Sequence, residues 1–173
     1  MRVLIVYETL YGTNRLIANA IAGGIGERAE ITILEARSAP STIGADVDLL
    51  VVGGPNHKTG LPRPATRVEA AAERDSTLDS ADPGLREWLD RLRLSHRGQP
   101  AAVWDTRMAS PRILDLFDHS ARMIAKGLSR AGARLVGKPK KFYSADGIGA
   151  LVAGEEERAR SWGAELANRL GRG

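Results

Sequence analysis

The sequence contains no cysteine and no long hydrophobic run. The absence of cysteine excludes disulfide bonds, thiolate metal sites, iron–sulfur clusters and thiol nucleophiles. The apolar stretches are much shorter than the roughly 20 residues that a membrane-spanning helix needs. The run that follows Arg2 is also too short for the core of a signal peptide. We therefore expect a cytosolic protein with no membrane span.

Size and charge set further limits. A chain of 173 residues, 43% of them hydrophobic, can bury one substantial core, so we expect a single domain over residues 1–173. The formal net charge of +4 would suit an acidic partner or a nucleic acid. The arginines are spread over helical segments, and the tryptophans lie in apolar patterns. We interpret the charge as a solvated basic surface and do not expect nucleic-acid binding.

Five short segments are typical of strands buried in a parallel sheet. They cover residues 2–7, 31–36, 48–53, 101–104 and 134–143, and we expect Pro139 to interrupt the last. Apolar spacing and capping residues predict five helices between and after them. These helices run from Asn14 to the glycines at 23–26, from 64 to 73, from Asp82-Pro83 through Leu92, through 123–128 to Gly132, and through 159–170. The alternation predicts an α/β domain with right-handed crossovers and helices on both faces.

Ligands of such sheets bind beyond the carboxyl ends of the strands, where we expect loops at residues 8–14, 54–63 and 105–110. The first loop has hydroxyl, glycine and amide side chains directly before a helix. Its backbone N–H groups and the positive end of the helix dipole could receive a phosphate. An ordinary N-capped turn is the alternative interpretation of this loop.

These residues resemble the flavodoxin family, whose phosphate loop runs S/T-x-T-G-N-T after the first strand. The corresponding residues here are Thr9-Leu10-Tyr11-Gly12-Thr13-Asn14. The sequence is most similar to flavodoxin-like proteins common in actinobacteria, also over residues 51–57, 60–67, 105–107 and 158–166. This resemblance implies a three-layer sandwich with a five-stranded parallel sheet of order 2-1-3-4-5, and FMN as the cofactor.

The resemblance also implies a cofactor site made of three loops, with the FMN phosphate in the first and the ring between the other two. The first loop would contribute Thr9, Leu10, Tyr11, Gly12, Thr13 and Asn14. The ring would be flanked by Pro55, Asn56, His57, Lys58, Thr59, Gly60, Asp105, Thr106 and Arg107. Unless they are simply solvated charges, Lys58 and Arg107 would favour an anionic reduced flavin.

The ring site departs from the family pattern in one respect. Relatives often carry tryptophan in the second loop, where this chain has Lys58-Thr59. Tyr11, His57 or Trp104 could replace it as a stacking partner, although Trp104 lies inside a predicted strand and is more typical of a core residue.

Three functions remain open. The first is an FMN protein that transfers electrons between redox partner proteins, with an acidic partner favoured by the basic chain. The second is an FMN-dependent NAD(P)H or quinone oxidoreductase, in which Lys58, Arg63 and Arg107 could bind an anionic substrate. The third is a flavin-free interaction protein that kept only the fold. No metal site is predicted, because the three histidines lack the spacing of metal ligands.

Overall fold

The main sheet has the predicted parallel α/β arrangement. The computed structural model describes residues 1–57, 60–72, 83–109, 119–145 and 149–171. The strands follow the order β2-β1-β4-β6, and β7 and β8 both pair with the outer side of β6. The two short strands therefore share the fifth position, and the order 2-1-3-4-5 is confirmed. The strands are β1 (Arg2–Tyr7), β2 (Glu30–Glu35), β4 (Leu49–Pro55), β6 (Pro100–Met108), β7 (Arg134–Leu135) and β8 (Lys140–Ser144).

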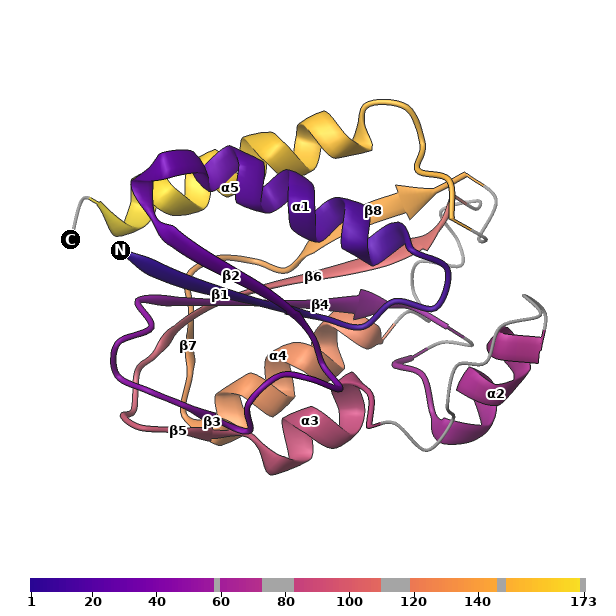
Figure 1. The fold of residues 1–173 in the computed structure, drawn as a ribbon, viewed down its shortest axis with the longest axis horizontal. Helices are drawn as coiled ribbons and strands as arrows, with labels where there is room; N and C mark the ends of the chain where they lie inside the picture. The colour runs from indigo at the N-terminus through magenta and orange to yellow at the C-terminus, as the bar shows by residue number, and fades with distance from the viewer. Residues whose placement is uncertain (58–59, 73–82, 110–118, 146–148, 172–173) are drawn as a thin grey trace.

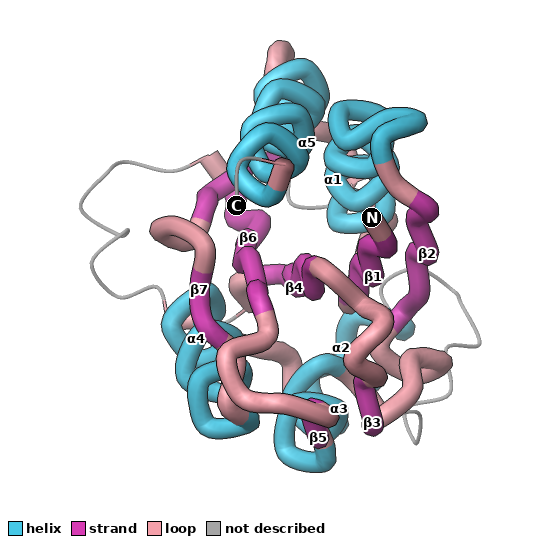
Figure 2. Tube along the Cα trace, turned by 90° about the vertical axis from the view of Figure 1, so that its left-hand side faces the viewer, coloured by secondary structure: helices cyan, strands magenta, loops and turns pink. Residues whose placement is uncertain are grey.

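Helices cover both faces of this sheet. One face carries α1 (Thr13–Ile25) and α5 (Glu155–Leu170), and the other carries α3 (Leu85–Arg91) and α4 (Ser120–Ala131) (Figures 1 and 2). Helix α2 (Pro64–Ala72) lies beside the carboxyl ends of the strands. The remaining elements are the 3-10 helix η1 (Gly26–Arg28) and a separate pair of two-residue strands, β3 (Thr42–Ile43) and β5 (Arg93–Leu94). No helix in these described ranges is long and apolar enough to cross a membrane.

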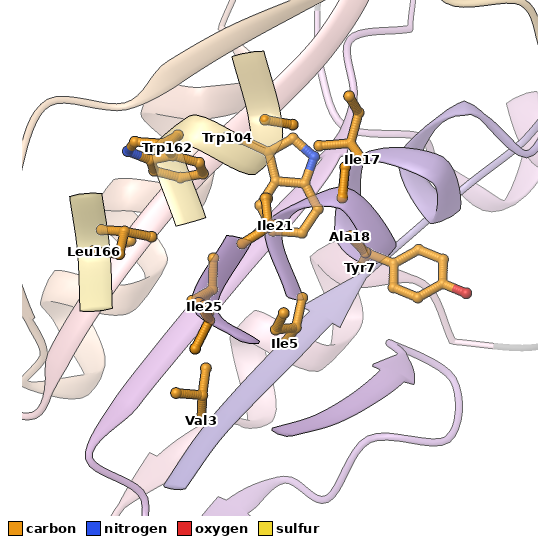
Figure 3. Close-up of a cluster of buried hydrophobic side chains, with 14 of the residues drawn as sticks. Val3, Ile5, Tyr7, Ile17, Ala18, Ile21, Ile25, Trp104, Trp162 and Leu166 are labelled. Carbon is orange, nitrogen blue, oxygen red and sulfur yellow. The ribbon is translucent and has the colours of Figure 1, made fainter. Parts of the chain in front are cut away.

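Each face of the sheet buries its own hydrophobic cluster. Figure 3 shows Val3 and Ile5 of β1 beneath Ile21 of α1, with Trp162 and Leu166 of α5 beside them. Alternate residues of the strands point to the opposite face, where they pack against α3 and α4. Because both faces are covered, the central strands contain continuous apolar runs, at residues 3–7, 49–55 and 101–104, and these runs are the pattern from which the strands were predicted.

Three predicted boundaries were wrong. Strand β6 continues through residues 105–108, which we expected to form a loop, because all four residues pair with β8 and the first two also pair with β4. Strand β4 likewise continues to Pro55. Helix α3 begins at Leu85 with Gly84 as its N-cap, after the predicted start at Pro83, and Asp82 lies outside the described residues.

The end of α1 was predicted at the glycines of residues 23–26, and of these glycines Gly26 is the one that ends the helix. Gly23 and Gly24 lie inside the helix, which ends at Ile25 and is capped by Gly26. A Cβ atom on Gly24 would lie 1.8 Å from the backbone oxygen of Arg160, so this glycine is needed where α1 and α5 touch. A Cβ on Gly163 of α5 would lie 2.1 Å from the backbone oxygen of Ile21. The two helix backbones therefore approach each other through glycine from both sides.

Replacing Gly24 and Gly23 in turn should distinguish the effect of helix packing on stability from the effect of helix propensity. We expect Gly24→Ala to lower the free energy of unfolding by about 1–3 kcal/mol, because backbone atoms of α5 must move. Gly23→Ala is the matched control, since its Cβ would meet only the end of the flexible Arg160 side chain. That change should be neutral or stabilising by up to about 1 kcal/mol. Urea unfolding of both variants tests this, and equal effects would contradict the glycine contact.

Candidate functional site

The loop at residues 9–14 is built to expose backbone N–H groups at the start of α1. Gly12 is the N-cap and has a left-handed conformation with φ of 89°, which glycine adopts without steric cost. Its own N–H donates to Thr9 Oγ1 at 2.9 Å. The next two N–H groups, of Thr13 and Asn14, belong to the first helical turn, where partners within the helix are lacking, whereas the N–H of Arg15 donates to the backbone oxygen of Gly12 at 3.1 Å. The loop and the helix dipole together form an anion-binding arrangement.

Asn14 is turned toward the sheet. Its side chain is almost fully buried; its Nδ2 donates to Thr106 Oγ1 at 2.8 Å, and its Oδ1 accepts from Trp104 Nε1 at 2.9 Å. The amide that sequence reasoning assigned to phosphate is thus engaged with β6. Of the groups of Asn14, the backbone N–H in the first turn of α1 is the one left for an anion at the helix start.

A cavity of about 250 Å³ lies between the three segments predicted to hold the cofactor. From the first segment it is lined by Thr9, Leu10, Tyr11, Thr13 and Asn14. The end of β4 contributes Pro55, Asn56 and His57, and β6 contributes Thr106 and Arg107. Ten of the fifteen predicted residues therefore meet at one cavity. The described part of its lining contains no carboxylate.

The other five predicted residues have different positions. Gly12 supports the first loop as described above, and Gly60 borders a neighbouring cavity, where its backbone exchanges hydrogen bonds with His57. Lys58 and Thr59 lie outside the described residues. Asp105 is fully buried and does not reach the cavity.

Arg107 borders the cavity but its charge is paired. Its guanidinium lies 2.5 Å from Asp105 Oδ2, and both side chains are at least 95% buried. Asp105 also accepts the backbone N–H of Ala121, in the first turn of α4, at 3.2 Å. The expected attraction between Arg107 and a reduced flavin is therefore weakened, because the neighbouring carboxylate offsets the positive charge.

The three proposed stacking residues differ in whether they line the cavity. Trp104 is fully buried against Gly53, where a Cβ would lie 1.9 Å from the indole ring, so the core interpretation is confirmed. Tyr11 and His57 are half-buried and line the cavity. These two side chains are the aromatic groups that could contact a planar ligand there.

Two further cavity residues, Met108 and Ser144, were missed from the sequence. Met108 is 57% exposed at the end of β6, and Ser144 ends β8. The rule that ligands bind at the carboxyl ends of strands could have identified Ser144. Met108 lies within the predicted loop at residues 105–110, but only residues 105–107 of that loop were assigned to the cofactor. No group of three His, Asp or Glu suited to a metal occurs among the described residues.

A second buried ion pair, between Glu8 and Arg67, lies next to the loop at residues 9–14. Glu8 accepts Arg67 Nε at 2.7 Å and the backbone N–H of Leu85 at 2.9 Å. Arg67 also reaches Glu87 Oε2 at 2.5 Å. Burial raises the pKa of Glu8, although the charge of Arg67 opposes that shift. The network ties the end of β1 to both α2 and α3.

No family model and no curated protein matches this sequence, but solved structures do. Oxidised flavodoxin 1 from Bacillus cereus is 18% identical with a TM-score of 0.67, over 97% of this chain and 98% of that one. A flavodoxin from the domain Archaea is 12% identical with a TM-score of 0.62, over 99% of each chain. A WrbA-like protein from Agrobacterium tumefaciens is 16% identical with a TM-score of 0.60, over 99% and 98%. The chain has the flavodoxin-like α/β fold.

The Glu8 network predicts a pH-dependent defect. In Arg67→Met, the buried Glu8 carboxylate loses its cationic partner. We expect the free energy of unfolding at pH 7 to fall by about 3–5 kcal/mol. The pKa of Glu8 in the folded variant should rise further, since the opposing charge is gone. The defect should therefore be smallest below the ordinary glutamate pKa of 4.5 and grow as the pH rises through the folded value.

Two comparisons check this with denaturant unfolding at pH 4 to 8. In Arg67→Met/Glu8→Gln, the additional pH dependence should disappear. Arg130→Met, which breaks an exposed pair with Asp90, should cost less than about 1 kcal/mol. A defect in Arg67→Met that does not change with pH would contradict the assignment to Glu8.

Proposed function

We propose that this protein is a flavodoxin-like electron-transfer protein that binds FMN, with the phosphate at residues 9–14. The observation that carries this proposal is the meeting of three strand-end segments at one cavity, directly beside the first turn of α1. Structural neighbours that are flavodoxins support the choice of flavin.

The residues of the chain fit this cofactor in kind. The helix start offers backbone N–H groups to a phosphate, and Thr9 retains its O–H as a further donor. Tyr11 and His57 offer aromatic surface to a flavin ring, and the exposed side chain of Met108 offers apolar surface. Bound FMN would supply the redox chemistry, while the protein supplies binding, orientation and electrostatics.

Comparison of two glycines tests the phosphate site. Gly12 and Gly154 are both left-handed N-caps, with φ of 89° and 88°, and a Cβ on either would meet no atom within 4 Å. Alanine at either position should therefore lower stability similarly, by about 1–2 kcal/mol. Only Gly12→Ala should weaken FMN binding, by about tenfold or more, because a methyl group there hinders close approach of the phosphate.

The measurement is a titration of flavin-free protein with FMN, followed by fluorescence quenching and by the visible spectrum. Unfolding curves of both variants control for the backbone strain. Equal FMN affinity for Gly12→Ala and Gly154→Ala would contradict the phosphate site. Absence of binding by the unmodified protein at tens of micromolar FMN would reject the function and favour the flavin-free interaction protein.

We further propose a redox partner protein with an acidic docking surface. The formal net charge of +4 supports this choice. Reduction of the FMN-loaded protein by an acidic reductase should slow as ionic strength rises from about 0.01 to 0.5 M, because salt screens the attraction. Stopped-flow rates provide the test, with a basic reductase as the control of opposite sign. A rate independent of salt would contradict charge-steered docking.

The alternative function is an FMN-dependent NAD(P)H or quinone oxidoreductase. One observation favours it: a second cavity, with a basic lining, adjoins the first at His57. Steady oxidation of NAD(P)H in the presence of a quinone would support the enzyme over the carrier. The single domain over residues 1–173, the actinobacterial relatives and a location in the cytoplasm also stay predictions.

A further inference from the structure

A second cavity, of about 410 Å³, lies next to the proposed flavin site. Its charged and titratable lining consists of Arg63, Arg86, His57 and His119. No aspartate or glutamate lines it in the part of the chain that the structure describes. His57 also borders the first cavity, so a ligand held here would lie beside the proposed cofactor.

Arg86 is held in this cavity with unused hydrogen-bonding capacity. Its Nη2 donates to the backbone oxygen of Leu61 at 2.8 Å and lies 4.0 Å from Met123 Sδ. Its Nε is buried, and among the described residues it has no hydrogen-bond acceptor. A buried donor without a partner destabilises the folded protein. An acceptor supplied by a ligand would remove that cost.

The neighbouring backbone is also fixed. His57 and Gly60 exchange two backbone hydrogen bonds, of 2.8 and 3.2 Å. The N–H of Arg63 donates to Thr66 Oγ1 at 2.9 Å, and the Thr66 hydroxyl donates back to the oxygen of Arg63 at 3.0 Å. His119 is the N-cap residue of α4. Four basic side chains thus start from ordered positions around one space, which reduces the entropy lost when a ligand binds.

We propose that this cavity binds the phosphate group of a small-molecule substrate that reaches the flavin. Two guanidinium groups present several N–H donors in fixed planes, which suits the oxygens and double charge of a phosphate. An uncharged quinone could accept hydrogen bonds from these groups but would lack the charge attraction that a phosphate gains. The assignment to a flavin substrate rests on the proposed FMN function, and it favours a phosphate-bearing nicotinamide nucleotide over a quinone.

The test is calorimetric titration of the FMN-saturated protein with inorganic phosphate, because FMN then blocks the phosphate loop. We expect Arg86→Gln and Arg63→Gln each to raise the dissociation constant for phosphate by about tenfold, as loss of a charge-assisted hydrogen bond would. Arg134→Gln is the control for net charge, since Arg134 is exposed on β7, at the amino-terminal end of β6. It should bind phosphate as the unmodified protein does.

FMN affinity should be unchanged in Arg86→Gln, which distinguishes this site from the flavin cavity. If the protein binds no FMN, phosphate is titrated into flavin-free Gly12→Ala, in which the loop is impaired. Binding that depends on Arg86 would then support the phosphate site while the flavin function fails. Phosphate affinity that is equal in Arg86→Gln, Arg63→Gln and Arg134→Gln, or undetectable up to about 10 mM in the unmodified protein, would overturn the proposal.

Discussion

The buried side chain of Asn14 is the contact on which the candidate site depends. It joins the first turn of α1 to two residues of β6, Trp104 and Thr106, by hydrogen bonds of 2.9 and 2.8 Å. The backbone oxygen of Thr106 then accepts the N–H of Asn56 at 2.7 Å, which fixes the residues after β4. Because buried polar groups are costly when unpaired, this chain of bonds holds three separate segments in one arrangement. The cavity is the space that they leave.

Two buried carboxylates repeat one structural solution at this end of the sheet. Glu8 follows β1 and Asp105 lies in β6, and each accepts a backbone N–H at the start of a helix, α3 or α4. Each is also paired with one arginine, Arg67 or Arg107, within 2.7 Å. A helix start carries partial positive charge, so a carboxylate there orients the helix, while the arginine offsets the cost of burying the charge.

The same polar contacts explain what could be read from the sequence. Apolar runs such as residues 49–52 identify strands, because a sheet covered on both faces leaves no room for polar side chains. Residues 105–107 looked like a loop because they are polar. Their burial depends on the pairing of Arg107 with Asp105, which forms only in the folded protein, and on the distant N–H of Ala121, which Asp105 accepts. Gly24 looked like a helix end, because nothing local reveals the backbone of α5 beside it. The second cavity was hidden for the same reason, as its arginines are 23 positions apart.

The pairing of charges also makes the linings of the two cavities electrostatically different. Arg107 borders the first cavity with its charge offset by Asp105, so that cavity offers a ligand mainly backbone N–H groups and uncharged side chains. No carboxylate lines the second cavity in the described chain, while Arg63 and Arg86 both line it. Since unscreened charge attracts anions most strongly in a partly enclosed site, the basic character of this end of the molecule acts in the second cavity. A cofactor in the first cavity would lie against a nearly neutral lining, while an anionic substrate would be attracted to the second cavity beside it.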